Sequence, residues 1–123
     1  MSRRKSTSLT ASLEFEKVYR EGSVCRGRLF SVHALPNTEG GPRLGLSVSK
    51  KVGVAVKRNV VRRRLREIFR AAAPDLPGGV DLVVSARAAA ADADFEELNE
   101  EFLAAMRKLN VRNAVGDTTG GEV

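Results

Sequence analysis

Alternating apolar and polar side chains mark two strands in the first half of the chain. Residues 28–36 and residues 43–49 both follow the two-residue period of a half-buried strand. The turn-forming residues 37–42 lie between them, so we expect these two strands to form a hairpin. Residues 80–88 are almost continuously apolar, which predicts a strand in the centre of the sheet. A short first strand is predicted over residues 23–28.

The longer period of a helix occurs in three other segments. Residues 11–21 form a short predicted helix, which Thr10 or Ser12 caps and Gly22 ends. Residues 55–72 form a second predicted helix. Its apolar side chains share one face, and they are Val61, Leu65, Ile68, Phe69 and Ala72.

The last predicted helix begins after Asp92 or Asp94, and Asp94 has capping-box spacing to Glu97. Its apolar positions recur at steps of three and four residues and are Phe95, Leu98, Phe102, Met106 and Leu109. We expect its acidic side chains to form an ordinary solvated face, and these are Glu96, Glu97, Glu100 and Glu101.

The predicted order of elements is α-β-β-β-α-β-α. It indicates an α+β fold, a two-layer sandwich in which helices cover one face of a single, mostly antiparallel sheet of about four strands. The length corresponds to about one domain, which we place at residues 9–112. We expect residues 1–8 to be a disordered basic arm and residues 113–123 a disordered tail.

One side of the helix over residues 55–72 carries guanidinium groups. At 100° per residue, with Arg58 set at 0°, five arginines and one asparagine fall between about 0° and 140°. These six residues, here called the guanidinium stripe, are Arg58, Asn59, Arg62, Arg63, Arg66 and Arg70. Each guanidinium presents five donors in a planar fork that matches phosphate oxygens. The stripe therefore predicts a binding site for a polyanion.

A solvated helix face is the alternative interpretation of the stripe. Solvated faces usually interleave acidic residues at i,i+4 spacing, which stabilises a helix by ~0.2–0.5 kcal/mol per pair. Here nine of the 21 residues from 50 to 70 are Lys or Arg, and only Glu67 is acidic. Because the like charges repel one another, we expect an external ligand, and nucleic acid in particular, to compensate for the repulsion.

The net charge of +6 is unevenly distributed along the chain. Residues 1–70 carry 17 Lys or Arg and 5 Asp or Glu, whereas residues 71–123 carry 4 and 10. Such a concentrated positive field steers a polyanion and gives salt-dependent binding. A membrane surface is the rival polyanion, but a membrane-surface helix exposes Trp, Phe or Leu beside its basic face. Since the core uses the apolar stripe of this helix, we predict no membrane partner.

Small polar side chains lie on the outer face of the two alternating strands. They are Ser31, His33, Gly45, Ser47 and Ser49. With Phe15 and Tyr19 beside it, this face can hold an extended single strand, because aromatic rings stack on unpaired bases at ~1–3 kcal/mol per base. A plain solvent face with Phe15 in the core is the alternative.

Groups for catalysis are sparse in this sequence. We find no paired carboxylates, no Ser/His/Asp set, no phosphate-binding glycine loop and no carboxylate cluster for a metal ion. Cys25 is the only cysteine of the chain and cannot form an internal disulfide. His33 is the only histidine that could activate its thiol and is distant in the sequence, so we expect the thiol to be inert. The sequence contains no apolar run of membrane length and no signal-peptide core, which predicts a cytoplasmic location.

Residues 45–70, GLSVSKKVGVAVKRNVVRRRLREIFR, resemble the protein component of bacterial ribonuclease P. The matching elements are the GLSVSKK strand end, the A-x-K-R-N helix start and the Arg-Asn-x-x-basic-Arg-x-x-Arg spacing. The upstream segment FEKVYREGS is similar to the short first helix of the family and its glycine stop. The similarity extends over roughly residues 9–109.

This resemblance implies a small basic cofactor of a catalytic RNA, which removes the 5′ leader of precursor tRNA by Mg²⁺-dependent hydrolysis. It assigns the protein no catalytic residue, no metal ligand, no organic cofactor and no obligate protein partner, and it places the Mg²⁺ mainly on the RNA. The implied fold contains a left-handed βαβ crossover.

The family roles carry over onto the residues already singled out. The stripe and the two lysines before it are expected to contact the RNA subunit. These residues are Lys50, Lys51, Arg58, Asn59, Arg62, Arg63, Arg66 and Arg70. Two aromatic residues and four residues of the polar sheet face are expected to hold the leader. They are Phe15, Tyr19, Ser31, His33, Ser47 and Ser49.

The sequence departs from the family pattern at two places. Val60 stands where many members carry a third basic residue, and Ser31 and His33 stand where larger, more apolar residues are frequent. Two other functions remain open. A ribosomal or assembly protein would also explain the charge and size, and a stand-alone nuclease is the third possibility, against which the missing carboxylate cluster argues.

Overall fold

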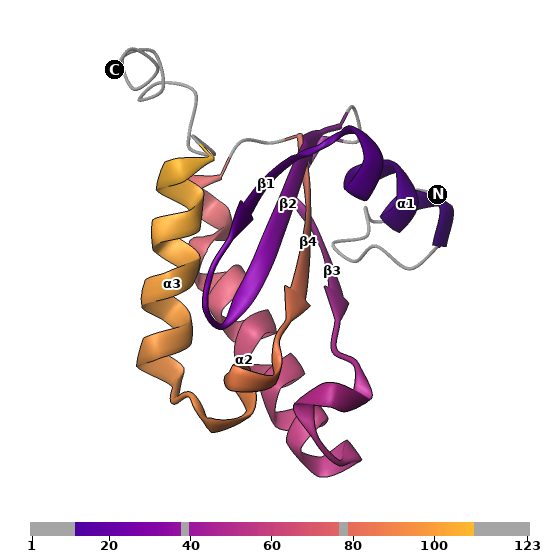
Figure 1. Cartoon of the computed structure of the whole chain (residues 1–123). Helices are drawn as coiled ribbons and strands as arrows, with labels where there is room; N and C mark the ends of the chain where they lie inside the picture. Colours follow the sequence, from indigo (N-terminus) through magenta and orange to yellow (C-terminus); the bar gives the residue numbers. More distant parts are fainter. Residues whose placement is uncertain (1–11, 38–39, 77–78, 110–123) are drawn as a thin grey trace, which may run out of the picture.

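The computed structural model describes residues 12–37, 40–76 and 79–109 (Figure 1). In this part of the chain, three α-helices and four strands follow one another in the predicted order. The elements are α1 (Ser12–Glu21), β1 (Ser23–Arg26), β2 (Phe30–Pro36), β3 (Arg43–Ser47), the 3-10 turn η1 (Lys50–Val52), α2 (Ala55–Ala72), η2 (Ala73–Asp75), β4 (Val80–Ala86), η3 (Ala88–Asp92) and α3 (Phe95–Lys108). The predicted arm, the predicted tail and Thr10 lie outside the described residues.

The four strands form one sheet in which β4 takes a central position, as its apolar sequence predicted. The strand order is β1-β2-β4-β3, with β1 and β4 antiparallel to β2, and β3 parallel to β4. The predicted hairpin between β2 and β3 is therefore wrong, because β4 lies between them. A strand that is apolar on both faces is buried best with a neighbour on each edge, and this requirement outweighs the turn preference of residues 37–42.

The parallel neighbours β3 and β4 are joined through α2. In Figure 1 both strands run towards the bottom of the view, β4 lies to the left of β3, and α2 passes behind the sheet. A crossover with this arrangement is left-handed, against the strong right-handed default. It lays α2 along one face of the sheet.

The main core lies between the sheet and the helices α2 and α3. Side chains of this core that are at most 1 % exposed include Phe30, Val32, Leu82 and Val84 from the sheet, Val61, Leu65 and Ile68 from α2, and Leu98 and Phe102 from α3. The buried face of α2 is the predicted one, because Ile68 and Phe69 are buried beside Val61 and Leu65. The remaining face of this helix is thus turned away from the core.

Helix α1 packs against the opposite face of the sheet, which corrects the prediction that the helices cover a single face. Val18 of α1 contacts Val83 of β4 in a small second cluster that also includes Phe15 and Leu35. Val83 points away from the main core because successive residues of a strand alternate between the two faces. The sheet is therefore covered on one face by α2 and α3 and partly on the other by α1 (Figure 1).

A buried ion pair adds to the attachment of α1. The guanidinium of Arg43 on β3 donates to both carboxylate oxygens of Asp81 on β4, at 2.8 and 2.9 Å, and Asp81 is 5 % exposed. A third nitrogen of Arg43 donates to the carboxylate of Glu14 at 3.3 Å. Because Glu14 belongs to α1, Arg43 ties this helix to two strands of the sheet.

Helix α3 begins as predicted, but one of its acidic residues has an unexpected role. Asp94 and Glu97 form the predicted capping box. Glu101, predicted to lie on a solvated face, instead accepts hydrogen bonds from the backbone N–H groups of Leu29 and Phe30 at 2.9 and 3.1 Å. Leu29 and Phe30 are buried where the connection from β1 enters β2, and a carboxylate of α3 satisfies amides that would otherwise lack an acceptor.

Candidate nucleic-acid interface

The guanidinium stripe lies on the outer side of α2. Arg63, Arg66 and Arg70 are exposed, whereas Arg58 and Arg62 are half-buried. The structure brings the stripe together along one helix, because its residues share the side of α2 that adjoins the buried face. It presents a continuous basic surface that is held by a helix packed on the core.

Few protein groups engage the arginines of the stripe. Arg58 donates through Nε to the carbonyl of Gly53 at 3.1 Å, and Arg62 donates to the amide oxygen of Asn59 at 3.2 Å. Within the described residues, none of the stripe arginines forms an ion pair with a carboxylate. Most of their guanidinium donors are therefore available to an external anion.

The basic surface continues past the start of α2. Lys50 and Lys51 are exposed in η1, where the backbone N–H of Lys51 donates to the hydroxyl of Ser49 at 3.2 Å. β3 ends at Ser47, two residues before the predicted end, so Ser49 caps this turn and does not belong to the sheet. Ser49 is thus placed with the lysines rather than with the polar sheet face.

A row of polar residues crosses the other face of the sheet, the one on which α1 lies. Cross-strand pairing aligns Arg26 with Ser31, Ser31 with Ser85, and Ser85 with Ser47, one residue from each strand. Arg87 extends the row, because its guanidinium donates to the hydroxyl of Ser31 at 3.3 Å. The predicted Ser31 and Ser47 therefore share one face, although they lie on strands that are not neighbours.

Aromatic side chains from α1 border this row. The ring centroids of Phe15 and Tyr19 are 6.4 Å apart, and those of Tyr19 and His33 are 4.8 Å apart with the ring planes at 89°. The hydroxyl of Tyr19 forms a hydrogen bond of 3.0 Å with the hydroxyl of Ser85. Tyr19 is 40 % exposed, whereas Phe15 is half-buried against the small core under α1. Phe15 therefore packs partly against the small core under α1 and partly beside Tyr19 at the polar face.

His33 lies between the aromatic rings and the basic end of the row. Its Nδ1 atom is buried and has no hydrogen-bond partner among the described residues. Burial, and secondarily the nearby Arg26 guanidinium, lower the pKa of His33 below its ordinary value of 6.5. The ring is therefore neutral at pH 7 and behaves as part of the aromatic cluster.

Sequence reasoning missed three members of this polar face, namely Arg26, Ser85 and Arg87. Ser85 lies in a strand whose other residues are mostly apolar, and only the strand order shows that it stands between Ser31 and Ser47. The signal available in the sequence was the polar pair Ser85 and Arg87, which share a strand face at the end of the predicted strand.

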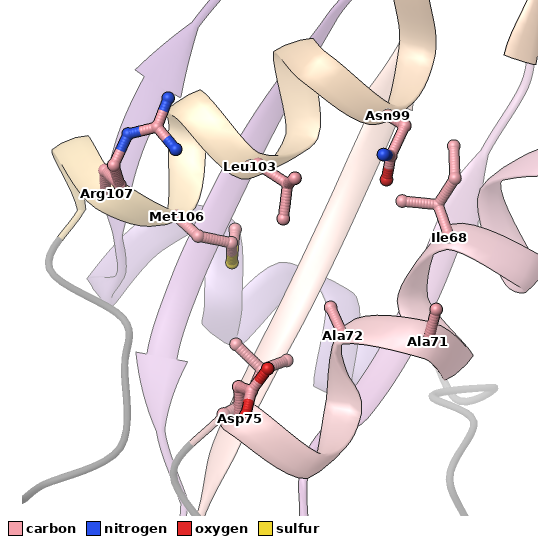
Figure 2. A pocket seen from close by; sticks show the side chains of 9 residues that line it. Ile68, Ala71, Ala72, Asp75, Asn99, Leu103, Met106 and Arg107 are labelled. Atoms are coloured by element: carbon pink, nitrogen blue, oxygen red, sulfur yellow. The ribbon is translucent and has the colours of Figure 1, made fainter. Parts of the chain in front are cut away.

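A groove lies elsewhere, where the C-terminal ends of α2 and α3 meet (Figure 2). It has a volume of about 350 Å³ and is lined by Ile68, Ala71, Ala72, Asp75, Leu76, Asn99, Leu103, Met106 and Arg107. Figure 2 shows Leu103 and Met106 of α3 directed towards the side of α2 that carries Ala72. None of the predicted site residues lines this groove.

Other kinds of site find little support in the described residues. No three His, Cys, Asp or Glu side chains in the described ranges gather closely enough to hold a metal ion. Among the described helices, none combines the length and apolar character that crossing a bilayer requires. The chemistry that these residues offer is anion binding by the stripe and stacking with hydroxyl contacts at the polar face.

Comparison with known proteins assigns this architecture to a family. A family model described as Ribonuclease P matches residues 3–110. The chain belongs to the ribonuclease P protein family. It is 40 % identical over 106 residues to the ribonuclease P protein component of Caldanaerobacter subterraneus subsp. tengcongensis, which covers 86 % of this chain and 91 % of that protein. The corresponding protein of Streptococcus pneumoniae is 36 % identical over 100 residues, with 81 % of each chain covered.

Solved ribonuclease P proteins share the fold as well. The protein from Staphylococcus aureus superimposes with a TM-score of 0.81 at 31 % identity, over 89 % of this chain and all of that one. The protein from Thermotoga maritima gives a TM-score of 0.71 at 32 % identity, over 79 % of this chain and 92 % of that one. The chain is accordingly a subunit of an endoribonuclease of tRNA processing, and it works together with the ribonuclease P RNA.

Proposed function

We propose that this ribonuclease P protein binds the catalytic RNA through the guanidinium stripe and holds the 5′ leader of precursor tRNA on the polar face of the sheet. The observation that carries the proposal is the stripe itself: five arginines on one side of α2, none of them in an ion pair within the described residues. Bidentate guanidinium forks match phosphate oxygens, and a rigid helix fixes their spacing. Lys50 and Lys51 extend this surface towards β3.

The assignment of the leader to the other face follows from its chemistry. An unpaired strand needs rings for its bases and donors for its backbone. Tyr19 and Phe15 supply the rings, His33 lies beside them, and the hydroxyls of Ser31 and Ser47 lie in the row with Arg26 and Arg87. These seven residues form the proposed leader site. Ser49 is left out of it, because this residue caps the turn that carries Lys50 and Lys51.

The two proposed surfaces lie on different sides of the molecule. The stripe belongs to α2, on one face of the sheet, and the leader site lies on the face that carries α1. The basic turn Lys50–Val52, which directly follows β3, is the shortest link between them along the chain. A protein placed in this way can contact the RNA subunit and the substrate at the same time.

The hydrolysis itself is proposed to belong to the RNA. Mg²⁺ held by the RNA would supply an activated nucleophile and would stabilise the leaving oxygen. The described residues do not fit a metal site of their own, because no suitable set of ligands gathers among them. The proposed contribution of this chain is positioning of substrate and neutralisation of phosphate charge.

Cleavage of a precursor tRNA with a 5′ leader at low Mg²⁺ tests the proposal. Cleavage would be measured in three samples: the full chain alone, a bacterial ribonuclease P RNA alone, and the two together. We expect cleavage at the mature 5′ end only when both are present. If the protein did not stimulate cleavage by the RNA but still bound other structured RNA, a ribosome-associated role would be indicated. Cleavage by the protein alone that a chelator abolishes would indicate a nuclease with its own metal site.

A further inference from the structure

The groove between the C-terminal ends of α2 and α3 continues as an exposed row of side chains along α3. Asn99, Leu103 and Arg107 line the groove and follow one another at steps of four residues, so they form one row on the helix (Figure 2). Phe95 precedes Asn99 by the same step. Phe95 and Leu103 are each 39 % exposed and are the large apolar side chains that α3 exposes. We call this row and the adjoining groove the α3 face.

Apolar side chains line the groove, and opposite charges border it. Ile68, Leu76 and Met106 line it and are at most 7 % exposed. Asp75, which follows α2, and Arg107 of α3 are both exposed, and neither forms an ion pair within the described residues. An apolar groove with a polar border is typical of an interaction site. Its occupant must offer apolar surface and charges of both signs.

The charge on the outer side of α3 changes sign from the start of the helix to its end. At 100° per residue from Phe95, Glu96 and Glu100 lie at about 100° and 140°, and Arg107 lies between these angles at about 120°. All three residues are exposed. Acidic groups therefore flank the first half of the row, and a basic group closes it. Because the acidic half repels phosphates, nucleic acid does not fit this face.

A second copy of this chain matches both the apolar and the charged parts of the α3 face. A two-fold axis perpendicular to α3 between Asn99 and Leu103 sets the two helices antiparallel, so that the same patch of each copy contacts the other. Rows at steps of four residues pack into the grooves of a facing helix. Phe95 of one copy then lies near the groove of the other, and the acidic start of each helix lies beside the basic end of the other, where opposite charges attract.

The α3 face does not overlap either proposed RNA surface. On the wheel of α2, with Arg58 at 0°, the groove residues Ile68 and Ala72 lie at about 280° and 320°, whereas the guanidinium stripe extends from about 0° to 140°. The leader site lies on the opposite face of the sheet, which carries α1. Two copies joined at their α3 faces therefore leave both surfaces exposed.

We propose that the α3 face is a homodimer interface, in which Phe95 of each copy packs against Leu103 and the groove of the other, and Glu96 of each copy pairs with Arg107 of the other. Specific interfaces bury about 1,200–2,000 Å² in total, and a contact through one helix and one groove lies at the lower end of this range. We therefore expect a reversible dimer with a dissociation constant on the order of 10 µM. The inference goes beyond the proposed function and does not depend on RNA binding.

Sedimentation velocity of the full chain without RNA, at concentrations below and above about 10 µM, measures this equilibrium. We expect the sedimenting species to change from monomer to dimer as the concentration rises. Phe95→Ala and Leu103→Ala should each weaken the dimer roughly tenfold or more, because each substitution removes two apolar contacts from the symmetric interface. Val54→Ala is the matched control: Val54 is 68 % exposed at the start of α2, outside the α3 face, and its substitution should leave the dimer unchanged.

A charge exchange separates the interface from effects on folding. Glu96→Lys and Arg107→Glu each place like charges at both ends of the contact, so each variant alone should be monomeric where the wild type is dimeric. A mixture of the two variants places opposite charges at both ends and should form the mixed dimer. Circular dichroism would establish that both variants are folded. A wild-type protein that stays monomeric, a dimer that Phe95→Ala and Leu103→Ala do not weaken, or a mixture that associates no better than its components would overturn the inference.

Discussion

Glu101 is the acidic residue of α3 whose loss we expect to destabilise the fold most. Its carboxylate accepts hydrogen bonds from the backbone N–H groups of Leu29 and Phe30 at 2.9 and 3.1 Å. Both of these residues are 1 % exposed, so water replaces a lost acceptor poorly. Because a hydrogen bond to a charged group contributes roughly 1.5–3 kcal/mol, Glu101→Ala should lower the free energy of unfolding by about 3–5 kcal/mol.

This loss is a large part of the stability of an ordinary domain, which is about 5–15 kcal/mol. We therefore expect the melting temperature of Glu101→Ala to fall by more than about 10 °C. Glu101→Gln keeps an acceptor oxygen without the charge, so its free energy of unfolding should lie between those of the alanine variant and the wild type. Urea unfolding followed by circular dichroism measures all three.

Glu100 provides the matched control. It is the preceding residue of the same helix and is exposed, so Glu100→Ala should change the free energy of unfolding by no more than about 0.5 kcal/mol. If Glu101→Ala proved as stable as Glu100→Ala, the carboxylate would not be the acceptor that secures the connection between β1 and β2, and the reasoning would be refuted.

Binding and pH measurements test the proposed surfaces. Arg63→Ala removes an exposed fork from α2 and should weaken assembly with the RNA subunit, whereas Arg107→Ala, the same charge change on α3, should not. Phe15→Ala should mainly weaken holoenzyme binding to precursor tRNA that carries a leader, by about 1–3 kcal/mol, and an equal loss for leaderless tRNA would contradict the leader site. The pKa of His33 is lowered below 6.5 by burial and by Arg26, so the unfolded chain takes up the proton first as the pH falls. The stability that the neutral ring contributes is present above pH 6.5 and is lost as the pH falls through the folded-state pKa. His33→Gln should reduce this pH dependence of the unfolding free energy, and an unchanged dependence would show that another group titrates.

The sequence by itself determined most of what depends on neighbours along the chain. The boundaries of α2, its buried face and the guanidinium stripe follow from the helical period, and the capping box of Asp94 follows from one local spacing. The candidate RNA surface was predictable for this reason: its members lie on a single helix, and a helix places every side chain relative to the next.

The tertiary structure decided which distant segments meet. The turn residues 37–42 favoured a hairpin, yet β4 occupies the place between β2 and β3. That insertion completes the polar row by placing Ser85 between Ser31 and Ser47, and it leaves Val83 facing α1. The physical reason is that a strand's partners are chosen by burial and by hydrogen bonds over the whole chain, whereas local sequence fixes only that a strand forms and which of its residues share a face.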